Sequence, residues 1–273
     1  MTGFQPDRSY DWAGLAAPGA LPVGYLVDVQ AILVRIGVDQ TYGKWNGPAD
    51  PVSRRYVYVP IPEVAGASFH SGLARPYSEV VPALRAFSQG VPHSHGALPT
   101  PLQDRLMHLD PDFEHLTYGD VGDKRGSEIR QLTRGDLLVF YAGLAPPSRR
   151  ARALIYAIVG VLVVDNVVDA ATVSAHRRHE NAHTRKVNHG ATDIVVRGMP
   201  EGSGRCARFV LIGDYRNRAY RVQRDLLDAW GGLSNKDGFL QRSARPPRFR
   251  DADRFQSWWH DQGVELVHNN FEP

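Results

Sequence analysis

The side chains best suited to chemistry alternate over one short segment, His108-Leu109-Asp110-Pro111-Asp112. In an extended chain, alternate residues point to the same side, so one imidazole and two carboxylates would face a common ligand. Such a set could bind a divalent cation such as magnesium or manganese, with Asp39 or His115 completing the site. The same groups could act as general acid and base. Because Asp-Pro-Asp is also a common turn and cap signal, a structural role is the alternative.

A second alternating segment, Asn181-Ala182-His183-Thr184-Arg185, offers an amide, an imidazole and a guanidinium. If this segment is extended, the three polar side chains share a face and could recognise a base edge or a phosphate. The preceding run His176-Arg177-Arg178-His179 is more simply explained as the solvated face of a helix. The segment is therefore a candidate nucleotide-binding element.

A Gly-rich polar loop at residues 37–48 contains Asp39 and Lys44, which could contact a sugar hydroxyl and a phosphate. The loop lacks the Gly-Lys-Ser/Thr ending of a phosphate-binding loop, and its glycines could be turn residues only. Aromatic side chains could stack on a base, a contact worth roughly 1–3 kcal/mol, although most aromatic residues belong to cores. The candidates are Tyr42, Trp45, Tyr141 and Tyr118, which is followed by Gly119.

Basic residues are numerous although the formal net charge is only +3. Of 32 lysines and arginines only four are lysines, and arginine pairs with phosphate through a planar fork. A GC-rich genome would give the same bias. Three arginines in the Pro-rich loop of residues 144–152 are candidates for contacts with a nucleic-acid backbone, which would make affinity depend on salt. They are Arg149, Arg150 and Arg152.

The pattern of apolar residues predicts a sheet that would position these groups. Strands are expected at residues 25–38, 54–61, 137–141, 155–165, 193–197 and 209–212. Helices are expected at residues 80–87, 168–179, 226–230 and 251–267, with a helix end at 127–132. We therefore predict an α+β fold with a mixed or antiparallel sheet or barrel core, peripheral helices and long loops. Residues 1–22 would form a flexible arm, and residues 23–273 a single domain.

Composition narrows the class of protein. With 42% hydrophobic and 22% charged residues, the 273-residue chain is typical of a globular protein. No apolar run approaches the roughly 20 residues that span a bilayer, and the polar N-terminus does not resemble a signal peptide. The single cysteine, Cys206, excludes an internal disulfide and a cysteine-rich zinc site. We expect a cytoplasmic protein with no membrane partner.

Four pieces of sequence occur in a fixed order and resemble the nucleotide modification associated domain 3 family over roughly residues 25–267. They are Arg35-Ile36-Gly37-Val38-Asp39 leading to Val59-Pro60-Ile61-Pro62; His108-Leu109-Asp110-Pro111-Asp112; Gly135-Asp136-Leu137-Leu138-Val139-Phe140-Tyr141 leading to Gly160; and Trp258 to Val267. The family is known mainly from gene neighbourhoods around base-modification systems of phages and bacteria. The resemblance thus implies a context of DNA modification or phage defence. Val38 stands where an aromatic is usual, and Tyr118-Gly119-Asp120 where Phe-Gly-Gln is common.

The strand that begins at Gly135-Asp136, with Tyr141 and Gly160, also resembles the PUA-like group, which includes EVE and ASCH domains. Those domains are small β-barrels that often bind modified or flipped bases. This shorter resemblance implies a barrel and a base-binding pocket.

Three functions follow as hypotheses. The first is a base-modification protein that binds or acts on a modified base or nucleotide, with DNA or a nucleotide as partner. The second is a metal-dependent enzyme acting on a small nucleotide or sugar nucleotide. The third is a non-catalytic subunit of a modification or defence complex, with protein partners. A divalent metal is a possible cofactor of the second.

Overall fold

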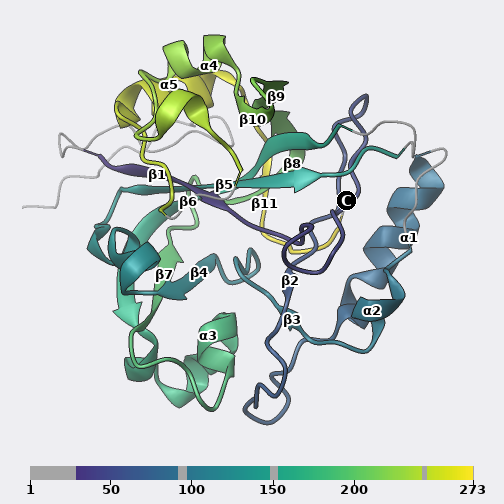
Figure 1. Ribbon diagram of the computed structural model, residues 1–273. Coiled ribbons are helices and arrows are strands. Elements are labelled where there is room, and N and C mark those ends of the chain that lie inside the picture. Colours follow the sequence, from purple (N-terminus) through teal and green to yellow (C-terminus); the bar gives the residue numbers. More distant parts are fainter. Residues whose placement is uncertain (1–28, 92–96, 148–152, 242–244, 273) are drawn as a thin grey trace, which may run out of the picture.

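The computed structural model describes residues 29–91, 97–147, 153–241 and 245–272. The predicted arm of residues 1–22 lies outside this range, as do Arg149, Arg150 and Arg152, the candidates for backbone contacts. A mixed sheet carries a few peripheral helices and long loops, which confirms the predicted α+β class (Figure 1). Within the described ranges, no helix is long and apolar enough to cross a membrane.

The centre of the sheet is the antiparallel pair of β5 (Leu137–Leu144) and β6 (Ile155–Asp169), which confirms the predicted hairpin. β-Branched residues dominate β6, and they favour extended backbone because their side chains are restricted in helices. The remaining strands add to this pair. β1 (Ala31–Arg35) joins β5 in parallel, whereas β7 (Asp193–Gly198) and β8 (Gly204–Leu211) pair with different halves of β6 in antiparallel fashion.

The strand path β1-β5-β6-β7-β4 is open at both ends. β4 (Thr117–Val121) pairs only with β7, and β1 only with β5 among the named strands. β11 (Leu266–Val267) adds a short outer strand to β8. The described residues therefore form no closed barrel, so the barrel alternative is wrong and the PUA-like resemblance is not supported.

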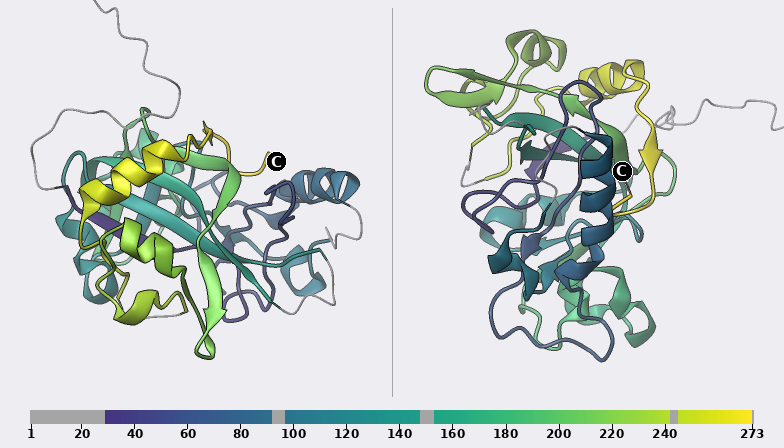
Figure 2. Two further views of the ribbon diagram at one scale, coloured as in Figure 1. Left: turned by 90° about the horizontal axis from the view of Figure 1, so that it is seen from above. Right: turned by 90° about the vertical axis from the view of Figure 1, so that its right-hand side faces the viewer.

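Side chains alternate between two cores on opposite faces of the sheet. One face contributes Ile32, Leu138 and Phe140 to a core shared with the irregular segments before and after β3 (Met107–His108). The other face packs against α4 (Arg224–Ala229) and α5 (Ala252–Asp261), which lie over the strands (Figure 2). Each fully buried aliphatic side chain contributes roughly 1.5–3 kcal/mol to folding.

A third apolar cluster lies at the side of the sheet, under α1 (Val81–Gly90) and α2 (Thr100–Gln103). Leu84 and Phe87 of α1 are buried there against Val57 and Val59. Pro82 occupies the first turn of α1, as predicted, where the missing N–H costs no helical hydrogen bond. α3 (Ala182–Arg185) is a single turn near β4 and β7.

Several predicted elements differ from the structure. Residues 56–60 of the strand expected at 54–61 are buried, but this segment joins a sheet only at β2 (Ile61–Pro62), which pairs with β3. It runs past the sheet instead, where the Tyr56 hydroxyl reaches the carbonyl oxygens of Val159 at 2.8 Å and Cys206 at 2.9 Å. The helix expected at 168–179 is wrong, because Val167 and Val168 continue β6 in pairing with β7.

Short 3₁₀ turns replace the helix expected at residues 168–179 and the helix end expected at residues 127–132. After β6 the chain forms Ala170–Thr172 and Ala175–Glu180. The helix end expected at 127–132 consists of Lys124–Ser127 and Ile129–Gln131. The predicted terminal helix is shorter, ending at Asp261, and its Trp259 is a core residue at 2% exposure.

Candidate functional site

A cavity of about 350 Å³ lies between the two edge strands β1 and β4. This volume falls within the roughly 300–1,000 Å³ typical of small-molecule sites. Eight of the predicted site residues line it, although they come from five separate parts of the chain. They are Asp39, Tyr42, His108, Asp110, Tyr118, Gly119, Tyr141 and His183. The structure thus brings most of the candidates from the sequence to one place.

Two histidines face a single carboxylate oxygen in this cavity. Oδ2 of Asp110 lies 3.9 Å from Nε2 of His108 and 4.0 Å from Nε2 of His183. The two imidazole rings meet edge to face, with centroids 5.0 Å apart. These distances exceed those of hydrogen bonds, so the three atoms surround a common point without contacting one another.

The far nitrogen of each ring is held by a second carboxylate. Nδ1 of His108 lies 2.9 Å from Oε2 of Glu63, and Nδ1 of His183 lies 2.7 Å from Oδ2 of Asp193. Although burial alone would raise them, hydrogen bonds and charges from these histidines lower the pKa of both carboxyls to about 2. An ionised carboxylate only accepts, so each Nδ1 carries a proton and, in a neutral ring, Nε2 keeps its lone pair.

Asp110 is fixed through its other oxygen. Oδ1 accepts the Gly119 N–H at 2.7 Å and the Asn181 side-chain amide at 2.9 Å. Burial raises the pKa of Asp110 to about 7, even though His183 and these two donors act in the opposite direction. Oδ2 accepts no hydrogen bond from any residue that the structure describes, and this leaves it directed toward the histidines.

Local structure explains how each side chain reaches the cavity. His108 ends β3, where it pairs with Ile61 of β2. His183 lies in the first turn of α3, whose N-cap Asn181 accepts the His183 N–H at 2.9 Å. Asn181 therefore caps the helix and supports Asp110 with the same side chain. An Asn at an N-cap is a strong local preference, so this part of the site follows from ordinary helix chemistry.

Arg35 and Asp39 form an ion pair at 3.0 Å elsewhere on the cavity wall. The Arg35 guanidinium lies 5.6 Å from the ring centre of Tyr156. Asp39 also accepts the N–H groups of Thr41 and Tyr42, at 2.6 and 2.7 Å, so it shapes the turn beside the cavity. The wall therefore contains a partly buried guanidinium, a group that can bind a phosphate or carboxylate.

A comparison of the sequence with models of protein families completes this description. The model of nucleotide modification associated domain 3 matches residues 30–259. The chain belongs to this family. No curated protein and no solved structure matches it. The family assignment associates the chain with nucleotide modification, and the matched range includes the three convergent side chains of the cavity.

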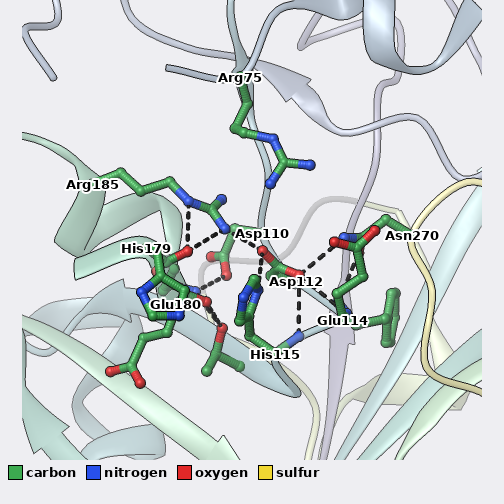
Figure 3. A network of polar contacts seen from close by, with 12 residues as sticks. Arg75, Asp110, Asp112, Glu114, His115, His179, Glu180, Arg185 and Asn270 are labelled. Atoms are coloured by element: carbon green, nitrogen blue, oxygen red, sulfur yellow. Dashed lines mark hydrogen bonds and ion pairs between the residues drawn. The ribbon is translucent and has the colours of Figure 1, made fainter. Parts of the chain in front are cut away.

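In this member of the nucleotide modification associated domain 3 family, Asp112 and Arg185 lie outside the cavity. They form a buried ion pair, with exposed fractions of 0% and 2% (Figure 3). The Asn270 amide donates to Asp112 at 2.9 Å, and Arg185 donates to the His179 carbonyl. Burial opposes ionisation, but these neighbours together with His115 hold the pKa of Asp112 well below its usual range. The arrangement is that of a structural network.

The aromatic candidates and Lys44 differ in their positions. Tyr42 lines the cavity and is 41% exposed, whereas Lys44 is exposed and does not line it. Trp45 packs against the cluster under α1. Tyr141 lines the cavity, and its hydroxyl donates to the Leu240 carbonyl at 2.8 Å.

Sequence reasoning missed three residues of the site in this family member. Glu63 and Asp193 orient the histidines, and Arg35 lines the wall. Glu63 follows the short strand β2 and Asp193 begins β7, so neither stands in a motif of its own. A signal did exist for the third convergent group, because His183 stands two residues after Asn181, the N-cap of α3.

Proposed function

We propose that the cavity between β1 and β4 binds a single nucleotide, free or extruded from a nucleic acid, and that base modification takes place beside His108, Asp110 and His183. The observation that carries the proposal is the meeting of these three groups in a cavity of a nucleotide modification associated domain. Supporting features are the aromatic residues Tyr42 and Tyr141 in the same lining.

Different residues of the cavity would bind different parts of the nucleotide. Aromatic rings offer faces on which any base can stack, a contact worth roughly 1–3 kcal/mol. The Arg35 guanidinium, which is paired with Asp39, would bind a phosphate through its other N–H groups. A base inside a duplex must leave the stack to enter such a pocket, which is easiest for single-stranded or damaged sites. We therefore expect single strands to bind better than duplexes of the same sequence.

Equilibrium binding tests the proposal. Fluorescently labelled DNA and RNA oligonucleotides, with and without modified bases, and free nucleotides would be titrated at two salt concentrations. Tyr42→Ala should lower affinity about 5- to 150-fold, which corresponds to the stacking energy. Tyr215→Ala is the matched control, because Tyr215 is 61% exposed and does not line the cavity.

The outcomes separate the three roles. Binding with turnover, followed by mass spectrometry of the base, supports an enzyme. Tight binding that depends on a modification, without turnover, identifies a protein that recognises the modification. If the wild-type protein binds no oligonucleotide or nucleotide at low salt, the proposal is wrong. A role as a subunit of a larger complex then becomes the better explanation.

A further inference from the structure

Three potential ligand atoms from the described residues converge in the cavity. They are Oδ2 of Asp110 and the two Nε2 atoms, whose tautomers are set by Glu63 and Asp193. Their side chains have little contact with solvent: Asp110 is 5% exposed, His183 8% and His108 14%. One cation at the common point could be bound by all three atoms.

We propose that His108, Asp110 and His183 bind one divalent transition-metal ion. All three potential ligand atoms lie within 4.8 Å of one another. Metal–nitrogen and metal–oxygen bonds are about 2.0–2.2 Å, so an ion at the common point needs only a small inward movement of each side chain. The inference deepens the proposed function by adding a metal to the same cavity, but it does not depend on nucleotide binding.

The ligand types select the class of ion. Two imidazoles and one carboxylate favour iron, manganese, cobalt, nickel or zinc over magnesium or calcium, which prefer oxygen ligands. The sequence predicted an oxygen-rich set in which Asp112 was the third ligand; the structure places His183 there instead. Three protein ligands leave further coordination positions for water or substrate on the side that faces the cavity.

The surroundings are those of a metal centre. Ligating histidines usually donate their other N–H to a carboxylate, which fixes the ring and strengthens the ligand. Both histidines here do so, to Glu63 and Asp193. Gly119 also packs against the His183 ring, which occupies the space that a side chain at position 119 would fill. The outer groups therefore hold the donors in a ligand-ready orientation before any ion arrives.

A second cluster of possible ligands, Asp112, Glu114 and His115, fits a metal less well. Arg185 already neutralises Asp112 by a direct ion pair. The Asp112 carboxylate also accepts the Asn270 amide and the N–H of Glu114. An added dication would have to displace a buried guanidinium, so this cluster serves as an internal comparison.

Calorimetric titration of the untagged full-length protein tests the proposal. The protein would be stripped with a chelator, dialysed, and titrated with Mn²⁺, Co²⁺ and Zn²⁺ in separate experiments without nucleotide. We expect one ion per chain for at least one of these metals. Asp110→Asn should lower its affinity at least 10-fold, while retaining the hydrogen bonds that an amide can make to Gly119. His183→Ala should do the same.

Two further measurements guard against misfolding and surface binding. Circular dichroism and the thermal midpoint would show that each variant folds, and the visible absorption of bound Co²⁺ would report imidazole and carboxylate coordination directly. His260→Ala is the matched control, because His260 is exposed on α5, and it should bind metal like the wild type.

The proposal fails if the stripped wild type binds none of the three ions stoichiometrically, or if Asp110→Asn and His183→Ala bind as well as the wild type. Nucleotide binding is measured separately on chelator-treated protein. Metal binding without nucleotide binding would overturn the proposed function and leave the metal site. Nucleotide binding without metal binding would do the reverse.

Discussion

Gly119 of β4 lies directly against the ring of His183. A β-carbon at position 119 would come within 2.3 Å of Cδ2 of His183 and 2.6 Å of Oδ1 of Asn181. Carbon atoms do not approach so closely, so the ring and the capping amide occupy the space that a side chain would fill. The same glycine donates its N–H to Asp110. One residue thus sets the distance between β4 and α3 and orients a carboxylate.

Gly119→Ala should therefore displace His183 and weaken metal binding more than it weakens the fold. We expect a loss of about 1–3 kcal/mol in the free energy of unfolding, as for other overpacked sites. Urea denaturation and Co²⁺ titration would measure the two effects. Gly66→Ala provides the comparison, because no atom lies within 4 Å of a β-carbon there, although its positive φ adds local strain. Unchanged Co²⁺ affinity in Gly119→Ala would contradict this account.

The outer carboxylates should affect metal affinity through the histidines. Asp193→Asn removes the charge that orients His183, and Glu63→Gln does so for His108. Substitutions of such partners typically cost 10–100-fold in metal affinity, and we expect that range here. Titration with Zn²⁺ would measure it, with the exposed Asp214→Asn as control. A Zn²⁺ affinity within threefold of the wild type in both variants would argue against the orienting role.

The Asp112–Arg185 pair should matter for stability. Removing one partner of a buried ion pair leaves an unpaired charge, and Arg185→Ala or Asp112→Ala should lower the free energy of unfolding by about 3–5 kcal/mol. Chemical denaturation measures this loss. The double variant should cost less than the sum of the single ones, since both charges are then gone. Additive losses would show that the two residues act independently.

Stability should fall steeply in alkaline solution. Burial raises the pKa of Tyr56 and Tyr58 well above the usual value and that of Cys206 to about 12. Each group stays neutral in the folded chain but ionises on unfolding. Its contribution is therefore complete only well below the pKa of the unfolded group, about 8.5 for the thiol and about 10 for the tyrosines, and declines as pH rises through that value. Above it, the unfolding free energy should drop by up to about 1.4 kcal/mol per pH unit for each group.

Urea denaturation between pH 8 and pH 11 would measure this slope. Tyr56→Phe should make it shallower by one group, in addition to lowering stability at every pH because Val159 and Cys206 lose a donor. Tyr215→Phe, on an exposed tyrosine, should leave the slope unchanged. Identical slopes in all three proteins would mean that Tyr56 ionises freely in the folded state.

Local patterns predicted the parts of the fold that depend on neighbours in sequence. The β-branched run that forms β6 and the apolar run of β5 identified the central hairpin, and Pro82 marked the start of α1. The expected strand at 54–61 and helix at 168–179 failed because tertiary contacts decide there. Tyr56 reaches across to Val159, and Val168 finds a partner in β7.

The candidate site, like the fold, was predictable only where it depends on residues close together in the sequence. His108 and Asp110 were predicted together because they alternate within one segment. Asp112 departs from that alternation, since its N–H and carbonyl pair with Thr117 in a tight return of the chain. Its place beside Asp110 is taken by His183, and this depends on how α3 docks against β4. The spacing of residues in the sequence does not predict that docking. For the same reason it did not predict that Glu63 and Asp193 orient the histidines.

The open strand path has a consequence for the shape of the cavity. The two walls of the cavity are the first and last strands of one sheet and not two domains joined by a hinge. The gap between them is therefore governed by the curvature of the strands that connect them. Irregular register at Phe140/Tyr141 and at Val164/Asn166 bends those strands. Tyr141, at the first bend, is itself a lining residue, whereas Val164 and Asn166, at the second bend, are not. A substitution at the second bend would therefore change the width of the cavity with every residue of the lining intact.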